Sequence, residues 1–141
     1  MDAHRFLIIE DDEMAQMAMN RLLAATSVKI DSELAVNGRE ALDVLHAKLL
    51  GDGELPSAIV MDLMMPEMTG FEFLEAFEEL SEQFESLKEV PVFVVSAANA
   101  HEDVARCKRF DCVRAFVSKY PNALTISNLI KRHCQPLSSG A

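Results

Sequence analysis

Short apolar runs and amphipathic segments alternate along the chain. Continuous apolar runs of strand length occur at residues 6–9, 58–61, 92–95 and 115–117. Apolar residues recur at helical spacing in the segments 14–23, 40–50, 73–87, 102–110 and 123–133. Strands that alternate with helices in this way form parallel sheets covered by helices on both faces, so the pattern predicts an α/β fold.

The segment 28–34 differs from the other runs because its apolar and polar residues alternate. Alternation is typical of a strand with one solvated face, whereas the longer continuous runs indicate strands buried on both faces. We therefore expect a doubly wound sheet of five parallel strands in the order 2-1-3-4-5, with five helices. Ligands of such sheets bind where the strand order reverses, at the carboxyl ends of strands 1 and 3. Glu10 and Asp62 directly follow these two strands.

The composition is typical of one soluble domain. The 141 residues, 50% hydrophobic and 26% charged, suffice for one core, which we expect in residues 1–134, followed by a flexible tail at 135–141. A formal charge of −10 argues against nucleic-acid binding. The chain has no apolar stretch of membrane-spanning length and no signal peptide, and its three cysteines lack disulfide or metal spacing. These features predict a cytoplasmic protein that does not bind membranes.

Carboxylates gather at both of these strand ends. Residues 10–13 read Glu-Asp-Asp-Glu, and Asp62 follows the third strand. A hard divalent cation would relieve their repulsion, and Mg²⁺ suits one or two carboxylates completed by water and phosphate oxygens. Alternatively, the acidic residues at 10–13 only favour the N-terminus of the next helix. The independent position of Asp62 at the reversal point favours the metal site.

The most specific motif is the segment 61–70, Met-Asp-Leu-Met-Met-Pro-Glu-Met-Thr-Gly. Together with Glu10-Asp11, Ser96 and Lys119 in that order, it resembles the response-regulator receiver domain, the phosphoacceptor of two-component signalling. The resemblance covers nearly the whole chain. It implies a flavodoxin-like fold and a stand-alone, single-domain regulator with no effector domain.

The resemblance also implies roles for the residues of the site. Asp62 would accept a phosphoryl group on its carboxylate. Asp11 would bind Mg²⁺ directly, with help from Glu10 and from the backbone carbonyl of Met64. Lys119 would supply positive charge to the phosphoryl oxygens, in agreement with the electrostatic demands of phosphoryl transfer. A surface lysine at a strand end is the alternative interpretation of Lys119.

Two residues would form a conformational switch if the resemblance holds. Ser96 would donate a hydrogen bond to a phosphoryl oxygen and draw the loop after strand 4 inward. The vacated space would be filled by Phe116, which fits plain packing in an edge strand equally well. The surface that changes would comprise helix 4, strand 5 and helix 5.

Several positions depart from the family pattern. Tyr120 precedes Pro121, where the family usually has Lys directly before Pro, and Cys112 stands where Gly is often found. Both changes concern the shape of the output surface. Met64 and Ala98 are apolar at positions where the family tunes hydrolysis, and neither side chain can orient a water molecule. They predict a comparatively long-lived phosphoryl group.

Charge is distributed unevenly along the chain. Residues 1–100 carry six Lys or Arg and twenty Asp or Glu, a net of −14, whereas residues 101–141 carry seven and three, a net of +4. The hypothesis is that an acidic protein docks on the basic surface of helix 4, strand 5 and helix 5, although a merely solvated basic face is an equal alternative. The basic residues expected there are Arg106, Lys108, Arg109, Arg114, Lys131 and Arg132.

These observations predict a phosphoacceptor response regulator, not a turnover enzyme. Its expected partners are a histidine kinase or a histidine phosphotransfer protein and a downstream protein target. One alternative is a Mg²⁺-dependent phosphohydrolase of related architecture, because Glu10 and Asp12 can imitate its carboxylate spacing; the motif around Asp62 and the absence of a cap domain weigh against it. The other is a degenerate receiver that acts only as a binding module, which the complete set of site residues disfavours.

Overall fold

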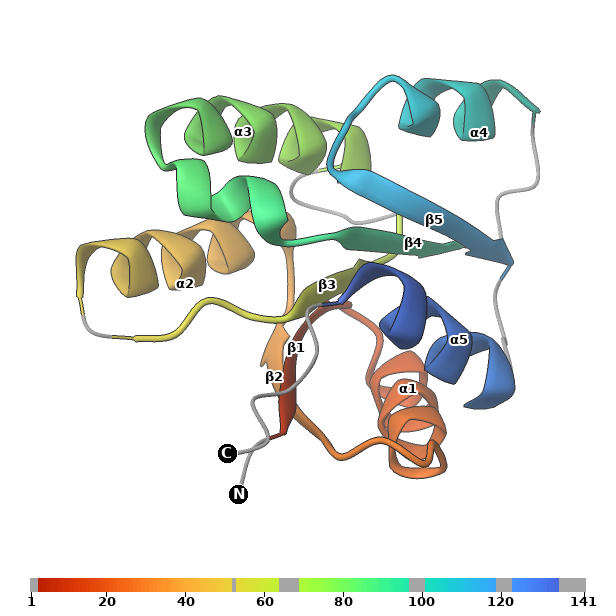
Figure 1. The fold of residues 1–141 in the computed structure, drawn as a ribbon. Coiled ribbons are helices and arrows are strands. Elements are labelled where there is room, and N and C mark those ends of the chain that lie inside the picture. Colours follow the sequence, from red (N-terminus) through yellow and green to blue (C-terminus); the bar gives the residue numbers. More distant parts are fainter. Residues whose placement is uncertain (1–2, 52, 64–68, 97–100, 119–122, 135–141) are drawn as a thin grey trace.

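The chain folds as five parallel strands alternating with helices. The computed structural model describes residues 3–51, 53–63, 69–96, 101–118 and 123–134 (Figure 1). Its elements are β1 (His4–Ile9), α1 (Glu13–Ala24), β2 (Ile30–Ala35), α2 (Gly38–Leu50), β3 (Ala58–Met61), α3 (Gly70–Gln83), the 3₁₀ helix η1 (Glu85–Glu89), β4 (Val92–Ser96), α4 (His101–Lys108), β5 (Val113–Ser118) and α5 (Ala123–His133). The strand order is β2-β1-β3-β4-β5. The predicted fold class and strand order are therefore confirmed.

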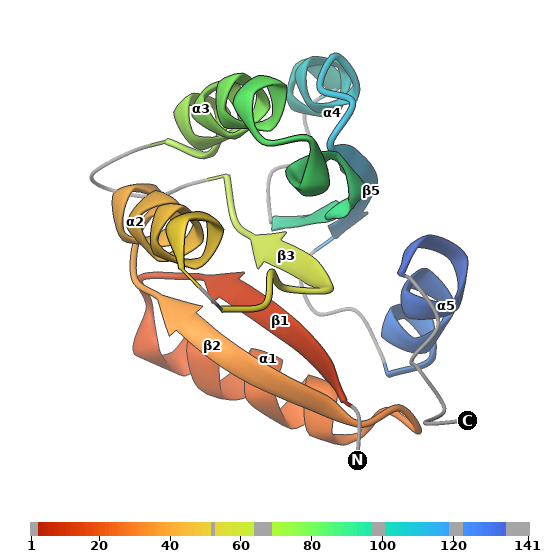
Figure 2. The same cartoon turned by 60° about the vertical axis from the view of Figure 1, so that its left-hand side comes forward.

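Helices cover both faces of the sheet. Helices α1 and α5 lie on one face, and α2, α3 and α4 lie on the other (Figures 1 and 2). Successive residues of β1 alternate between the two cores: Leu7 and Ile9 pack on the α2–α4 face, while Phe6 and Ile8 pack on the α1/α5 face. This double burial explains the continuous apolar runs of the central strands. Within the described ranges, no helix is both long enough and apolar enough to cross a membrane.

Local capping determines where three helices begin. The Asp12 carboxylate accepts the Ala15 N–H at 2.8 Å and caps α1. Asn37 caps α2 by accepting the Glu40 N–H at 2.7 Å, so Asn37-Gly38 forms a strand-to-helix turn. At α3, Thr69 and Glu72 form a reciprocal capping box. These bonds satisfy N–H groups that lack partners within the helix.

Gly70 positions the start of α3 against the end of β3. A Cβ atom at residue 70 would lie 2.7 Å from Leu63 Cα and 2.8 Å from the Met61 methyl carbon. The Gly70 N–H also donates to the Leu63 carbonyl at 2.9 Å. Only a residue without a side chain permits this approach. Gly70 therefore fixes how closely the start of α3 approaches the end of β3.

The structure corrects one helix. The apolar spacing predicts a single helix over 73–87, but α3 ends at Gln83, Phe84 is extended, and Leu87 lies in η1. Leu87 is fully buried there. The break arises because the chain must turn back toward the start of β4, and the short 3₁₀ turn keeps Leu87 in the core while it does so. The predicted tail 135–141 lies outside the described residues.

Candidate functional site

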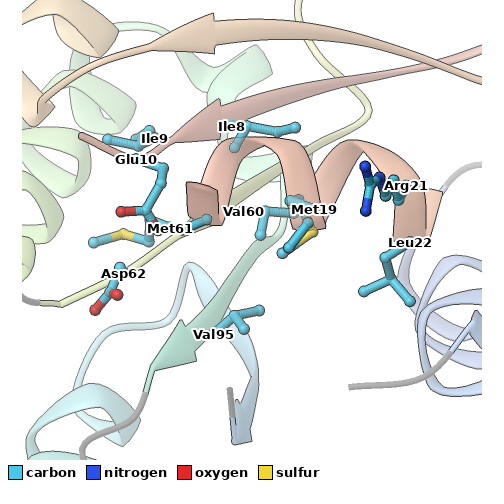
Figure 3. Close-up of a pocket in the computed structure, with 12 residues that line it drawn as sticks. Ile8, Ile9, Glu10, Met19, Arg21, Leu22, Val60, Met61, Asp62 and Val95 are labelled. Carbon is cyan, nitrogen blue, oxygen red and sulfur yellow. The ribbon is translucent and has the colours of Figure 1, made fainter. Parts of the chain in front are cut away.

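Two carboxylates lie together where the strand order reverses. Strands β1 and β3 are neighbours with Ile9 opposite Met61, so the next residues, Glu10 and Asp62, lie at the same sheet edge. Their exposed fractions are 9% and 5%. Figure 3 shows both side chains at one end of a pocket beside α1. The structure therefore buries two acidic groups at the position where doubly wound sheets bind ligands.

Hydrogen bonds hold the acidic turn after β1 in place. The Glu10 N–H donates to the Ala35 carbonyl at 3.0 Å, and the Gln16 side-chain amide donates to the Glu10 carbonyl at 2.8 Å. The Asp12 N–H donates to the Glu10 carboxylate at 3.3 Å. Asp11 and Asp12 are both exposed, and the Asp12 carboxylate caps α1. The turn is thus tied to β2 on one side and to α1 on the other.

Gln16 is a site-forming residue that the sequence analysis missed. It lies in the first turns of α1 among apolar neighbours, and its amide reaches back to the main chain of Glu10. Gln16 could have been recognised as a polar side chain six residues after a predicted ligand, on a helix that packs against the sheet. The signal is weak because exposed glutamines are common on helices.

Several of the predicted site residues lie outside the described part of the chain. Met64 and Lys119 are among them, and for Ser96 the structure describes only the main chain, at the end of β4 beside Ser118 of β5. Phe116 lies in β5 opposite Val94, half-buried, and packs against the core on the α2–α4 face. Its aromatic ring is therefore already part of that core.

The donor atoms of the site suit a hard cation. Among the described residues, no three His, Cys, Asp or Glu side chains are arranged to hold a metal. Mg²⁺ does not require such a cage, because it keeps several waters and binds through one or two carboxylates. Glu10 and Asp62 are two carboxylates at adjacent strand ends. They fit Mg²⁺ as a pair of oxygen donors.

The cysteines do not provide thiolate groups for metal binding or nucleophilic attack. Burial raises the pKa of Cys107 and of Cys134 to about 11, and it raises the pKa of Cys112 further. A thiol must lose its proton to bind metal or act as a nucleophile, so these side chains stay protonated near neutral pH.

Five of the six basic residues, all but Arg106, lie toward the edge of the sheet where the strands begin. Helices α4 and α5 run back from the carboxyl edge, so their last turns lie where the strands begin (Figure 1). Arg106 lies instead beside the start of α3, at the carboxyl edge, where its guanidinium carbon is 3.8 Å from the centroid of the Phe71 ring. All six predicted residues are exposed: Arg106, Lys108, Arg109, Arg114, Lys131 and Arg132. We call them the basic corner.

Fold and site together define a doubly wound α/β protein with an acidic site at its strand reversal. The family model of the response regulator receiver domain matches residues 6–131. The chain belongs to this family.

Curated relatives are plant two-component response regulators. ORR1 of Oryza sativa subsp. japonica is 27% identical over 142 aligned positions, which cover 96% of this chain and 56% of ORR1. ARR17 of Arabidopsis thaliana is 33% identical over 110 positions, covering 72% of this chain and 66% of ARR17. The chain thus spans little more than half the length of ORR1.

Solved structures share the fold. A two-component response regulator from Cytophaga hutchinsonii superposes with a TM-score of 0.81 at 25% identity, over 94% of this chain and 97% of that one. The receiver domain of sensor histidine kinase PA1611 from Pseudomonas aeruginosa PAO1 has a TM-score of 0.74 at 17% identity, over 94% and 98%. That structure has a magnesium ion coordinated in its active-site cleft.

Proposed function

We propose that this chain is a phosphoacceptor of a two-component phosphorelay, and that Asp62 receives the phosphoryl group from a histidine kinase or a histidine phosphotransfer protein. The observation that carries the proposal is the pair of buried carboxylates, Glu10 and Asp62, at adjacent strand ends of a receiver-family fold. Such a pair offers oxygen donors that suit a hard cation, and phosphoryl transfer uses one.

In the proposed reaction, one carboxylate oxygen of Asp62 attacks phosphorus in line with the leaving nitrogen of the donor histidine. An oxygen–phosphorus bond forms as the phosphorus–nitrogen bond breaks, and the imidazole keeps the electron pair of the broken bond. Bound Mg²⁺ would supply positive charge to the phosphoryl oxygens. This chain would hold the ion through Glu10, Asp11, Asp62 and the backbone carbonyl of Met64.

Two further residues would act on the phosphoryl group. The Lys119 ammonium would neutralise a phosphoryl oxygen, and the Ser96 hydroxyl would donate a hydrogen bond to another. Motion of Ser96 would then be coupled to the packing of Phe116, whose half-buried ring already contacts the α2–α4 core. Apolar Met64 and Ala98 cannot orient an attacking water, so we expect the aspartyl phosphate to be long-lived.

The signal would leave through the surface of α4, β5 and α5 to an acidic downstream protein, with the basic corner as its docking patch. We assign residues 1–134 to the receiver and 135–141 to a tail, and a cytoplasmic location without nucleic-acid or membrane binding. Reversing the charges of Arg109 and Lys131 should weaken partner binding, and unchanged affinity would contradict this surface.

Treatment of the full chain with acetyl phosphate and Mg²⁺ tests the phosphoacceptor. We expect one hydroxylamine-labile phosphoryl adduct by mass spectrometry, absent in Asp62→Asn. Asp12→Asn is the matched control, because asparagine also caps helices and the Asp12 carboxylate already caps α1. An adduct that persists in Asp62→Asn, or catalytic turnover of phosphate esters, would contradict the proposal.

A further inference from the structure

A cavity of about 350 Å³ lies between α1 and the sheet, beside the two buried carboxylates (Figure 3). Its walls come from the three central strands and from one side of α1. The apolar lining includes Ile8, Val60, Val95, Ala18, Met19 and Leu22. Glu10 and Asp62 lie at one end and Arg21 at the other. The cavity is thus apolar along its length and acidic at one end.

Small residues help to keep this space open. Ala15 and Ala18 line the cavity from α1, where longer side chains would reach over the strands. Ala18 and Arg21 are exposed, so the cavity opens to solvent along α1. Its volume of about 350 Å³ is in the range of small-molecule sites, which combine apolar walls with a few convergent polar groups.

We propose that this cavity binds a small organic ammonium ion with an apolar body, its charged nitrogen at Glu10 and Asp62 and its hydrocarbon part against Ile8, Val60 and Val95. Apolar walls exclude inorganic ions from most of the cavity, and carboxylates favour a cationic head over a neutral or anionic one. Each carboxylate offers about four acceptor positions. An ammonium ion can therefore bind to Glu10 and Asp62 in addition to the partners that these carboxylates already have. Arg21 disfavours a second positive charge at the far end.

The ligand would regulate the proposed phosphoacceptor. This part of the inference rests on the proposed function, because the same two carboxylates would serve Mg²⁺ there. Occupation by an ammonium ion would therefore compete with Mg²⁺ and slow phosphorylation of Asp62.

The probes for the test are hexylamine, hexanol and hexanoate, which share an apolar chain and differ in the charge of the head. Binding to the full chain is followed by methyl NMR of Ile8, Val60 and Val95. We expect saturable chemical-shift changes with hexylamine. Hexanol should bind roughly tenfold more weakly or worse, and hexanoate should show no detectable binding. Mg²⁺ should raise the apparent dissociation constant of the amine. The absence of saturation up to about 10 mM hexylamine, or equal affinity for the alcohol, would overturn the inference.

Paired variants locate the binding. Ala18→Leu places a larger side chain at the cavity and should weaken hexylamine at least about tenfold, whereas Ala24→Leu, another exposed alanine of the same helix, should leave it unchanged. Asp62→Asn should weaken hexylamine but not hexanol. Equal affinity of Ala18→Leu and the wild type for hexylamine would show that the amine binds elsewhere and would overturn the proposal.

The two proposals fail separately. Labelling by acetyl phosphate in the absence of amine reports only on Asp62 as phosphoacceptor. Normal labelling without amine binding overturns the cavity ligand alone, while amine binding without labelling overturns the phosphoacceptor and leaves the cavity ligand standing, without its regulatory role.

Discussion

The two faces of the sheet differ in how completely they are filled. On the α2–α4 face, the core includes the fully buried rings of Phe73 and Phe77, whose centroids are 5.8 Å apart. On the α1/α5 face, the core is smaller and a cavity extends along α1 to Glu10 and Asp62. Close packing gives rigidity, whereas open space beside buried charges permits ligand binding. The comparison indicates that one face mainly stabilises the fold and the other mainly serves the site.

The largest effect should come from the filled face. Phe77→Ala removes a fully buried ring and should lower the free energy of unfolding by about 3–5 kcal/mol. Leu22→Ala on the cavity side should cost about 1 kcal/mol, because Leu22 is half-buried and already borders open space. Urea unfolding measures both. Equal losses of unfolding free energy in the two variants would contradict the difference in packing between the two faces.

Gly70→Ala tests the close contact between β3 and α3. The new methyl group would collide with the Leu63 main chain, so we expect a loss of about 1–3 kcal/mol in the free energy of unfolding. Gly53→Ala is the control, because its methyl group would meet the long Lys48 side chain, and its effect should stay within about 0.5 kcal/mol. A neutral Gly70→Ala in thermal unfolding would show that the contact adjusts freely.

Gln16→Met tests whether the Gln16 side chain supports the acidic turn after β1. Methionine has a similar length but cannot donate to the Glu10 carbonyl, so we expect Mg²⁺ affinity to fall about tenfold. Gln16→Arg restores a donor and should recover much of the affinity. Asn20→Leu is the matched control, because it removes another α1 amide, one that accepts from Ser32. Isothermal titration with Mg²⁺ separates a positioning role of Gln16 from a loss of fold. Equal Mg²⁺ affinities of Gln16→Met and Asn20→Leu would refute the positioning role.

The smallest effect concerns pH, and it should also arise on the α1/α5 face. Burial lowers the pKa of His4, whose Nδ1 is buried without a hydrogen-bond partner among the described residues. The unfolded chain therefore binds a proton more readily, so stability is complete above the unfolded pKa and falls as pH decreases below it. His4→Leu should flatten this decline between about pH 7.5 and 5.5 in urea unfolding. An unchanged slope would assign the decline to other groups, such as His133, whose pKa is lowered by burial and then by Arg132 and Arg114.

Much of the fold was predictable because its signals are local. Continuous apolar runs at residues 6–9, 58–61 and 92–95 identified the central strands. The placement of Glu10 and Asp62 at one sheet edge followed from the strand order. By contrast, the break of α3 at Gln83 was missed, because apolar spacing continues through Leu87 although the helix does not.

The sequence by itself determined the order of the strands and the acidic residues at the strand reversal. Each depends on side-chain period or on neighbours a few residues apart. Only the tertiary structure decided that Gln16 holds the Glu10 carbonyl, that Arg106 stacks on Phe71, and that α1 leaves a cavity beside Asp62. These features depend on distances between elements remote in sequence, which are set by how the helices pack on the sheet and not by any local pattern.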